Sequence, residues 1–183
     1  QKKYPEIWLA GGRGCVDGDT LIDTPRGKIP MGDFQGGEVF AYDEGLHRVV
    51  KAHAEQARQF PKTDLYAVKL LYGQEIVVTD EHKFLTPRGW KMTKELASGD
   101  FVVLGEQNSE IGSLGRIEYI KFKKHDHYWD TNVIGYHNYF AHGFINHNST
   151  KSSFVSTCIP LLMEMNPKIH CVCFRKYAAN LLD

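Results

Sequence analysis

Two short stretches near opposite ends of the chain each contain half of a loop that could bind phosphate. GGRG occupies residues 11–14, directly after the apolar run IWLA, and TKS occupies residues 150–152. A phosphate-binding loop needs glycines whose backbone N–H groups surround the anion, followed by a lysine and a hydroxyl residue. Each half alone is a weak signal, because glycine pairs are common in ordinary turns. Together they predict a nucleotide-binding loop that residues 15–148 interrupt.

The two flanks read as one unit once residues 15–148 are set aside. Their joined sequence, IWLAGGRG–STKSSFVSTCIPLLMEM, has the order strand, glycine turn and helix, and a second apolar strand follows at 169–174. This is the order of a phosphate-binding βαβ unit, although Thr150 replaces the last glycine and Pro160 would kink the helix. The residues expected to bind the nucleotide are Gly11, Gly12, Arg13, Gly14, Ser149, Thr150, Lys151 and Ser152.

The joined flanks resemble the ATPase start of a phage terminase large subunit, the DNA-packaging motor. The resemblance rests on the joined loop GGRGSTKSS and covers only residues 1–14 and 149–183. It implies a host protein that binds ATP and Mg²⁺ once the loop is intact. It also implies that only the full-length host protein binds DNA.

The segment between the flanks has the apolar pattern of an all-β domain. Short apolar stretches such as LYAVKLLYG and GDFVVLGE alternate with turn signals at brief intervals, which is typical of antiparallel strands. A helix is possible only around residues 92–97 and 52–59.

An internal repeat divides this segment. TPRG occurs at 24–27 and again at 86–89, an offset of 62 residues, and the apolar register continues from GGEVFAY at 36–42 to SGDFVVL at 98–104. A duplicated β unit related by a pseudo-two-fold axis explains both matches.

Three stretches of the segment resemble the conserved blocks of inteins, the self-splicing protein elements. CVDGDTLI at 15–22 is similar to the opening block, GQEIVVTDEHKF at 73–84 to the T-x-x-H block, and YWDTNVIGYHNYFAHGFINHN at 128–148 to the closing blocks. The resemblance implies the horseshoe-shaped Hedgehog/intein (Hint) β fold; Thr131 and Asn146 stand where the family usually has apolar residues. The residues that it marks as catalytic are Cys15, Thr79, His82, Asp130, His137, His147, Asn148 and Ser149, with splice junctions at Gly14–Cys15 and Asn148–Ser149.

The first half of the implied chemistry acts at the upstream junction. Cys15 would attack the unhindered carbonyl of Gly14 and convert the amide to a thioester, because a thiol is a better nucleophile than an alcohol at neutral pH. Thr79 and His82 suit stabilisation of the oxyanion and protonation of the departing nitrogen. Asp130 suits steering of the thiol.

The second half acts at the downstream junction. The hydroxyl of Ser149 would take over the upstream segment as an ester, and the side-chain nitrogen of Asn148 would then attack its own carbonyl to form a succinimide. His147 would polarise that carbonyl and His137 would relay a proton, because histidine titrates near neutral pH. The freed amine of Ser149 would finally convert the ester to an amide. The chain's own flanks are the substrate, and the splicing needs no cofactor.

The sequence also allows other functions. His125-x-His127, with His137 or His142, could hold zinc. A Hedgehog-type domain that only cleaves is a second alternative, and a nucleotide-binding protein with an inert β insertion is a third. The linker at 105–116 is too short for a homing endonuclease, so a minimal splicing element is expected.

Composition limits the class of protein. The chain has 183 residues with 22 basic and 22 acidic side chains, and none of its apolar runs approaches the roughly 18–20 residues that a membrane span needs. The N-terminal apolar run is too short for a secretory signal. Four cysteines show neither disulfide-framework nor zinc-finger spacing. We therefore expect a monomer in a reducing cytoplasm, without a membrane partner and with Cys15 as a free thiol.

Overall fold

The computed structural model describes residues 15–105 and 113–148, and these residues are almost entirely β. They contain no α-helix, only two single-turn 3-10 helices, η1 (Met31–Asp33) and η2 (Thr93–Glu95). The strands are β1 (Leu21–Thr24), β2 (Gly27–Pro30), β3 (Gly37–Asp43), β4 (Arg48–Ala54), β5 (Arg58–Leu70), β6 (Glu75–Thr79), β7 (Lys83–Thr86), β8 (Gly89–Met92), β9 (Phe101–Leu104), β10 (Ser113–Asp130), β11 (Asn138–Ala141) and β12 (Phe144–His147).

The all-β prediction is confirmed, and neither stretch in which a helix was possible forms an α-helix. Residues 52–59 form the end of β4 and the start of β5, because Ala52 and Ala54 are buried while His53 between them is exposed. That alternation has the period of two that belongs to a strand. The stretch 92–97 holds only the single turn η2.

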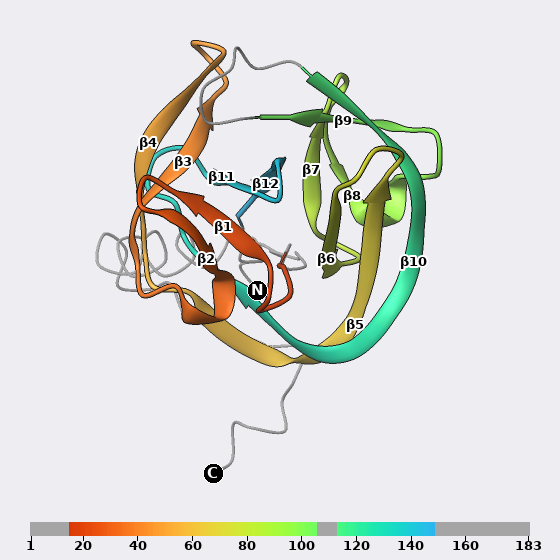
Figure 1. The fold of residues 1–183 in the computed structure, drawn as a ribbon, viewed down its shortest axis with the longest axis horizontal. Helices are drawn as coiled ribbons and strands as arrows, with labels where there is room; N and C mark the ends of the chain where they lie inside the picture. Colours follow the sequence, from red (N-terminus) through yellow and green to blue (C-terminus); the bar gives the residue numbers. More distant parts are fainter. Residues whose placement is uncertain (1–14, 106–112, 149–183) are drawn as a thin grey trace, which may run out of the picture. The chain divides into compact units, whose positions relative to one another are not determined.

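Most of these strands belong to one strongly curved antiparallel sheet. Eight strands follow the order β2-β1-β11-β12-β9-β10-β5-β6, β7 and β8 join through β12, and β3 and β4 form a separate pair. Figure 1 shows β5 and β10 curving together around one side of the domain. Their pairing shifts register at three places, and such bulges bend and twist a long strand. The described residues contain no helix long and apolar enough to cross a membrane.

The internal repeat is confirmed strand by strand. An offset of 62 residues carries β1 onto β7, β2 onto β8 and η1 onto η2 without a change of bounds. Even the turns match, since Thr24 Oγ1 donates to the carbonyl of Gly27 at 2.6 Å and Thr86 Oγ1 donates to that of Gly89 at 2.7 Å. Each TPRG sequence thus forms a local turn that is closed by the hydroxyl of its threonine.

The pseudo-two-fold axis passes close to the first described residues. Val16 pairs with Val78, its own equivalent in the repeat. Antiparallel pairing of a residue with its own copy is what a two-fold axis between the two halves produces. The duplication therefore brings the segment that begins at Cys15 against the end of β6.

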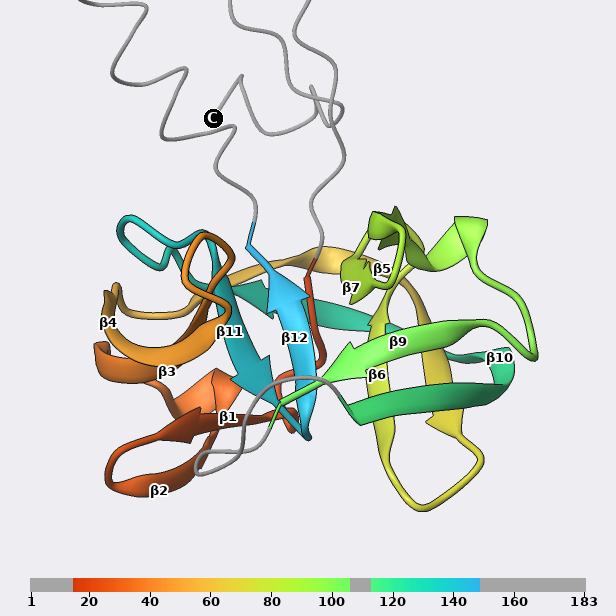
Figure 2. The same cartoon turned by 90° about the horizontal axis from the view of Figure 1, so that it is seen from above.

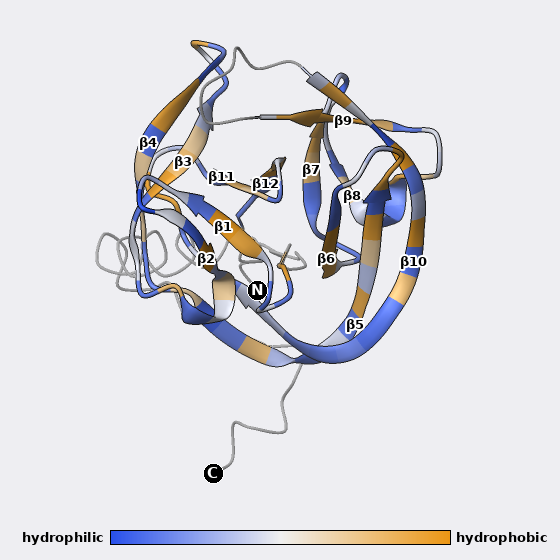
Figure 3. Ribbon diagram, in the orientation of Figure 1, coloured by the Kyte–Doolittle hydropathy of each residue, from blue (hydrophilic) through white to orange (hydrophobic). Residues whose placement is uncertain are grey.

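The core fills the space between the two repeats. Its main cluster includes Val16, Ile22, Val78, Phe84 and Phe144, all fully buried. Burial of each such side chain stabilises the fold by about 1.5–3 kcal/mol relative to exposure. The first described residues and β12 lie side by side near the middle of the domain (Figures 1 and 2), and hydrophobic residues are interspersed with hydrophilic ones along β5 and β10 (Figure 3).

Candidate active site

Cys15 lies fully buried opposite Thr79, the last residue of β6. The backbone N–H of Cys15 donates to Thr79 Oγ1 at 3.2 Å, and the N–H of Thr79 donates to the carbonyl of Cys15 at 3.0 Å. The first of these bonds involves the nitrogen that would leave if the bond between Gly14 and Cys15 were broken. The sequence-predicted pair is therefore brought into direct contact.

A tryptophan fixes the segment that follows Cys15. Val16 and Trp129 exchange both backbone hydrogen bonds, at 3.0 and 2.8 Å. The indole of Trp129 also packs on Gly18, where an added Cβ would come within 2.9 Å of the ring. That contact explains the glycine in CVDGDT, because a larger residue would push the segment away from β10.

His82 follows β6 in a tightly held turn. Its N–H donates to the carbonyl of Thr79 at 3.2 Å, and its own carbonyl accepts from both the N–H and the hydroxyl of Thr93, at 2.7 and 3.0 Å. The imidazole is fully buried, stands edge-on to Phe84 with ring centroids 4.8 Å apart, and its Nε2 lies 2.9 Å from Asn146 Oδ1. The histidine is thus fixed at both its backbone and its side chain.

Asp130 ends β10, directly after Trp129, and is almost fully buried. Tyr139 on β11 lies in the same region. The charges of Asp130 and Cys15 both help to raise the pKa of the Tyr139 phenol. The main cause is burial, and the pKa lies well above its ordinary value, so the phenol stays protonated. Asp130, Tyr139 and Cys15 therefore share one buried region, as the sequence predicted for Asp130 and Cys15 but not for Tyr139.

Asn148 is fully buried at the end of β12. Its backbone N–H donates to the carbonyl of His137 at 3.0 Å, and its side-chain Nδ2 donates to Asn132 Oδ1 at 3.2 Å. Asn132 is itself held by Glu55, which accepts from Asn132 Nδ2 at 3.3 Å and donates its N–H to the carbonyl of Asn132 at 2.9 Å. The carboxamide of Asn148 thus has a defined orientation.

The two downstream histidines differ in environment. His147 is half-buried, with its ring edge-on to Trp90 at 4.8 Å, and burial lowers its pKa below the ordinary value. His137 is exposed and has a left-handed backbone with φ of 58°. The hydrogen bond between His137 and Asn148 joins two backbone groups, so the proton relay expected of the His137 imidazole stays a prediction.

Besides Tyr139, Asn132 and Asn146 have positions in the site that the sequence did not predict. Nothing in the sequence marks Asn132 as a site residue, because single asparagines are common in turns. Asn146 had a signal in the sequence, a polar residue inside an otherwise apolar strand, but its meaning depends on His82, 64 residues away. The predicted residues Gly11, Gly12, Arg13, Gly14, Ser149, Thr150, Lys151 and Ser152 lie outside the described residues.

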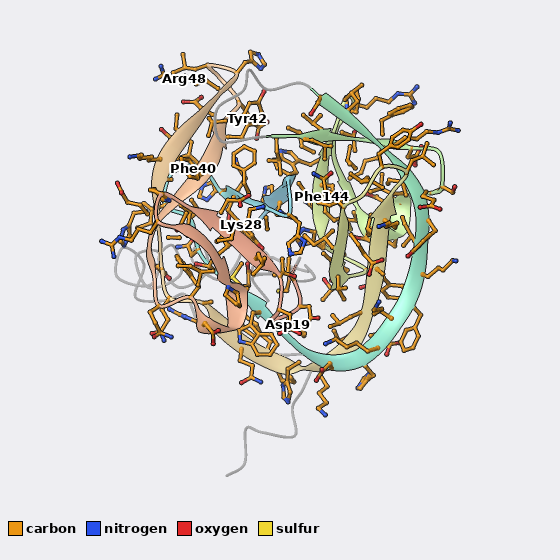
Figure 4. All side chains as sticks on the ribbon, in the orientation of Figure 1. Asp19, Lys28, Phe40, Tyr42, Arg48 and Phe144 are labelled. Carbon is orange, nitrogen blue, oxygen red and sulfur yellow. The ribbon has the colours of Figure 1, made fainter. Side chains whose placement is uncertain are left out.

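Two further histidines, His125 and His127, lie on β10. His125 Nδ1 contacts Asp64 Oδ1 at 2.8 Å and His127 Nδ1 contacts the carbonyl of Phe60 at 2.9 Å. Within 15–105 and 113–148 there is no group of three or more His, Cys, Asp or Glu side chains placed to hold a metal ion. A separate cavity of about 360 Å³ is lined by His142 and by residues that include Lys28 and Phe40 (Figure 4).

Sequence comparison finds replicative DNA helicases among the relatives of the chain. It is 32% identical over 106 residues to the replicative DNA helicase DnaB of Rhodothermus marinus, a match that covers 56% of this chain and 11% of that protein. It is 28% identical over 119 residues to DnaB of Synechocystis sp., covering 57% and 14%. The chain thus spans only a small part of these curated relatives. No protein-family model matches it.

Structure comparison identifies the fold. The Ssp DnaB mini-intein variant M86 has a TM-score of 0.72 and 26% identity, over 77% of this chain and 98% of that one. The DnaB intein from Synechocystis sp. PCC 6803 has a TM-score of 0.69 and 28% identity, over 74% and 99%. The gp41-1 intein, at 0.62 and 23%, shares the fold over 74% and 98%. These similarities support self-processing by protein splicing or a related cleavage, and the described residues have the Hint fold of these mini-intein structures.

Proposed function

We propose that residues 15–148 excise themselves and join Gly14 to Ser149 by autocatalytic protein splicing. One observation carries this proposal: a path of hydrogen bonds connects the two ends of the domain. Thr79 binds the N–H of Cys15, its carbonyl accepts from the N–H of His82, and His82 contacts Asn146, two residues before Asn148. This path supports the proposal because it links the segment that begins at Cys15 to the strand that precedes Asn148.

The first step is an N–S acyl shift at Cys15. The sulfur forms a bond to the carbonyl carbon of Gly14, the C–N bond breaks, and the nitrogen of Cys15 leaves as an amine after taking up a proton. Thr79 Oγ1, 3.2 Å from that nitrogen, fixes its position, and His82 supplies the proton. Asp130, in the same buried region, steers the thiol, whose ordinary pKa of about 8.5 leaves only a small thiolate fraction at pH 7.

The second step transfers the upstream segment to Ser149. The hydroxyl oxygen attacks the thioester carbonyl and the sulfur of Cys15 leaves as a thiol. Fixing the two junctions in one domain replaces a bimolecular encounter, and well-oriented intramolecular reactions reach effective molarities of about 10⁵ M or more. The Hint fold supports this step, since β12 lies beside the segment that begins at Cys15.

The third step is cyclisation of Asn148. Its Nδ2 attacks its own backbone carbonyl carbon, a succinimide forms, and the amine of Ser149 leaves. Asn132 orients the nucleophilic nitrogen from one side and the carbonyl of His137 holds the backbone N–H. Because burial lowers the pKa of His147, its imidazole is neutral at pH 7, and a neutral ring N–H can still donate to the carbonyl under attack. An O–N acyl shift at Ser149 completes the peptide bond.

The proposed host is a terminase ATPase. Joining Gly14 to Ser149 would produce the loop GGRGSTKSS, with Lys151 and Ser152 placed to meet ATP and Mg²⁺. Splicing itself would need no cofactor, no endonuclease and no partner beyond the flanking segments. We expect a monomer that acts in the cytoplasm, with DNA bound only by the full-length host.

Mass spectrometry of the precursor over time tests the splicing function. Incubation with reductant and chelator is expected to give joined flanks and a free piece of residues 15–148. Separate flanks would identify a cleavage-only domain, and an unchanged precursor would identify an inert insertion. Activity that stops with chelator and returns with zinc would favour the metal alternative. The Cys15→Ala, Asn148→Ala double variant is the control for background proteolysis.

A further inference from the structure

The side chain of Asn146 has only one orientation that satisfies its surroundings. The residue is fully buried on β12, and its Nδ2 donates to the carbonyl of Phe144 at 2.9 Å and to that of Ala141 at 3.4 Å. A flipped amide would point its oxygen at two carbonyl oxygens, which repel it. The oxygen, Oδ1, is therefore the atom that faces His82 Nε2 at 2.9 Å.

This orientation determines where His82 carries its proton. An amide oxygen can only accept a hydrogen bond, so the Nε2 it faces must be the donor. Neutral His82 is then the Nε2–H tautomer, and its lone pair lies on Nδ1. We propose that Asn146 is a positioning residue that sets the tautomer of His82, so that proton exchange at the Cys15 junction runs through Nδ1.

The same contact favours the protonated form of His82. Imidazolium is a stronger donor than imidazole, and a hydrogen bond from a charged donor is about twice as strong as a neutral one. The contact lies in an apolar region, since His82 stands against Phe84 and Phe84 against Phe144. Burial by itself disfavours the charged imidazolium there, and the oxygen of Asn146 offsets part of that cost. Asn146 thus stabilises the state in which His82 can give a proton to the leaving nitrogen.

Asn146 also belongs to the segment that carries the other junction. It lies on β12, two residues before Asn148, whereas His82 follows β6. The orientation of the upstream catalytic histidine consequently depends on correct docking of the downstream strand. This catalytic meaning rests on the proposed splicing function, but the tautomer itself does not.

Nitrogen NMR of the histidine ring tests the tautomer directly. In the unreactive Cys15→Ala, Asn148→Ala chain with ¹⁵N-labelled histidine, His82 is expected to show a protonated Nε2 and an unprotonated Nδ1 when neutral. In the same chain with Asn146→Leu, which is similar in volume but has no acceptor, a mixture of tautomers is expected. A proton on Nδ1 in the parent, or an unchanged tautomer in the leucine variant, would overturn the proposal.

The rate of upstream cleavage tests the consequence. In an Asn148→Ala, Ser149→Ala precursor, dithiothreitol traps the thioester and releases residues 1–14, and Asn146→Leu is expected to slow this about fivefold to tenfold. Ile145→Val is the matched control, because Ile145 lies on the same strand but packs in a different cluster with Phe140 and Leu85. Equal slowing by both variants would reduce Asn146 to a packing role. A parent without any thiol-induced cleavage would refute the splicing proposal, and the NMR result would still decide the role of Asn146.

Discussion

Removing the side-chain amide of Asn132 tests how the nucleophile of the third step is held. Asn148 Nδ2 donates to Asn132 Oδ1 at 3.2 Å inside a site where Asn148 is fully buried. In Asn132→Ala that acceptor is lost and the carboxamide of Asn148 can rotate. A neutral hydrogen bond contributes about 1 kcal/mol, and loss of a single orientation adds a few tenths more. The cyclisation of Asn148 should therefore slow about tenfold, since about 1.4 kcal/mol corresponds to a factor of ten.

The assay is downstream cleavage in a Cys15→Ala background, which removes the first two steps from the measurement. Release of the segment that begins at Ser149 is followed by mass spectrometry, and the melting temperature reports whether each variant is folded. Upstream thioester formation, measured separately with Cys15 present, should be unchanged in Asn132→Ala because the change lies at the other junction.

Thr131→Val is the matched control for this experiment. Thr131 is the neighbouring residue, is also buried, and donates its hydroxyl to the carbonyl of the same Glu55 that holds Asn132. Its loss should lower the melting temperature by a few degrees and leave the cleavage rate unchanged. The reasoning is refuted if folded Asn132→Ala cleaves at the parent rate, or if Thr131→Val slows cleavage equally.

Three other predictions follow from contacts in the site. Thr79→Val removes the acceptor for the N–H of Cys15 and should slow dithiothreitol-induced upstream cleavage about tenfold or more, while Asn148 cyclisation in a Cys15→Ala chain continues. Asn148→Ala should stop the reaction at the branched ester, visible as a species of precursor mass with two N-termini; joined flanks from this variant would contradict the assigned role. His147 has a lowered pKa in the folded protein, so the unfolded chain binds a proton where the folded chain does not. The free energy of unfolding should therefore fall as pH drops below about 6.5, and denaturant titrations of an unreactive precursor should show less of this fall in His147→Gln.

Much of the fold could be predicted because its information is local. The repeat of TPRG marks two turns closed by the hydroxyl of their own threonine, and the offset of 62 residues reproduces the bounds of β1, β2 and η1 in β7, β8 and η2. The strand that ends at Ala54, where the sequence also allowed a helix, has a tertiary cause. Alanines favour a helix by intrinsic propensity, but Ala52 and Ala54 are buried on one face of β4, and tertiary burial outweighs that weak preference.

The sequence by itself determined the class of fold and the repeat, because turn chemistry can be read along the chain. It also named the residues that we propose to react at the two junctions. Only the tertiary structure decided which groups orient them. Cys15 meets Thr79 through the pseudo-two-fold axis, and His82 meets Asn146 across 64 residues. The role of a side-chain amide such as that of Asn146 cannot be read from the sequence, because it depends on the hydrogen-bond partners. Those partners are determined by the packing of strands that are distant in the sequence.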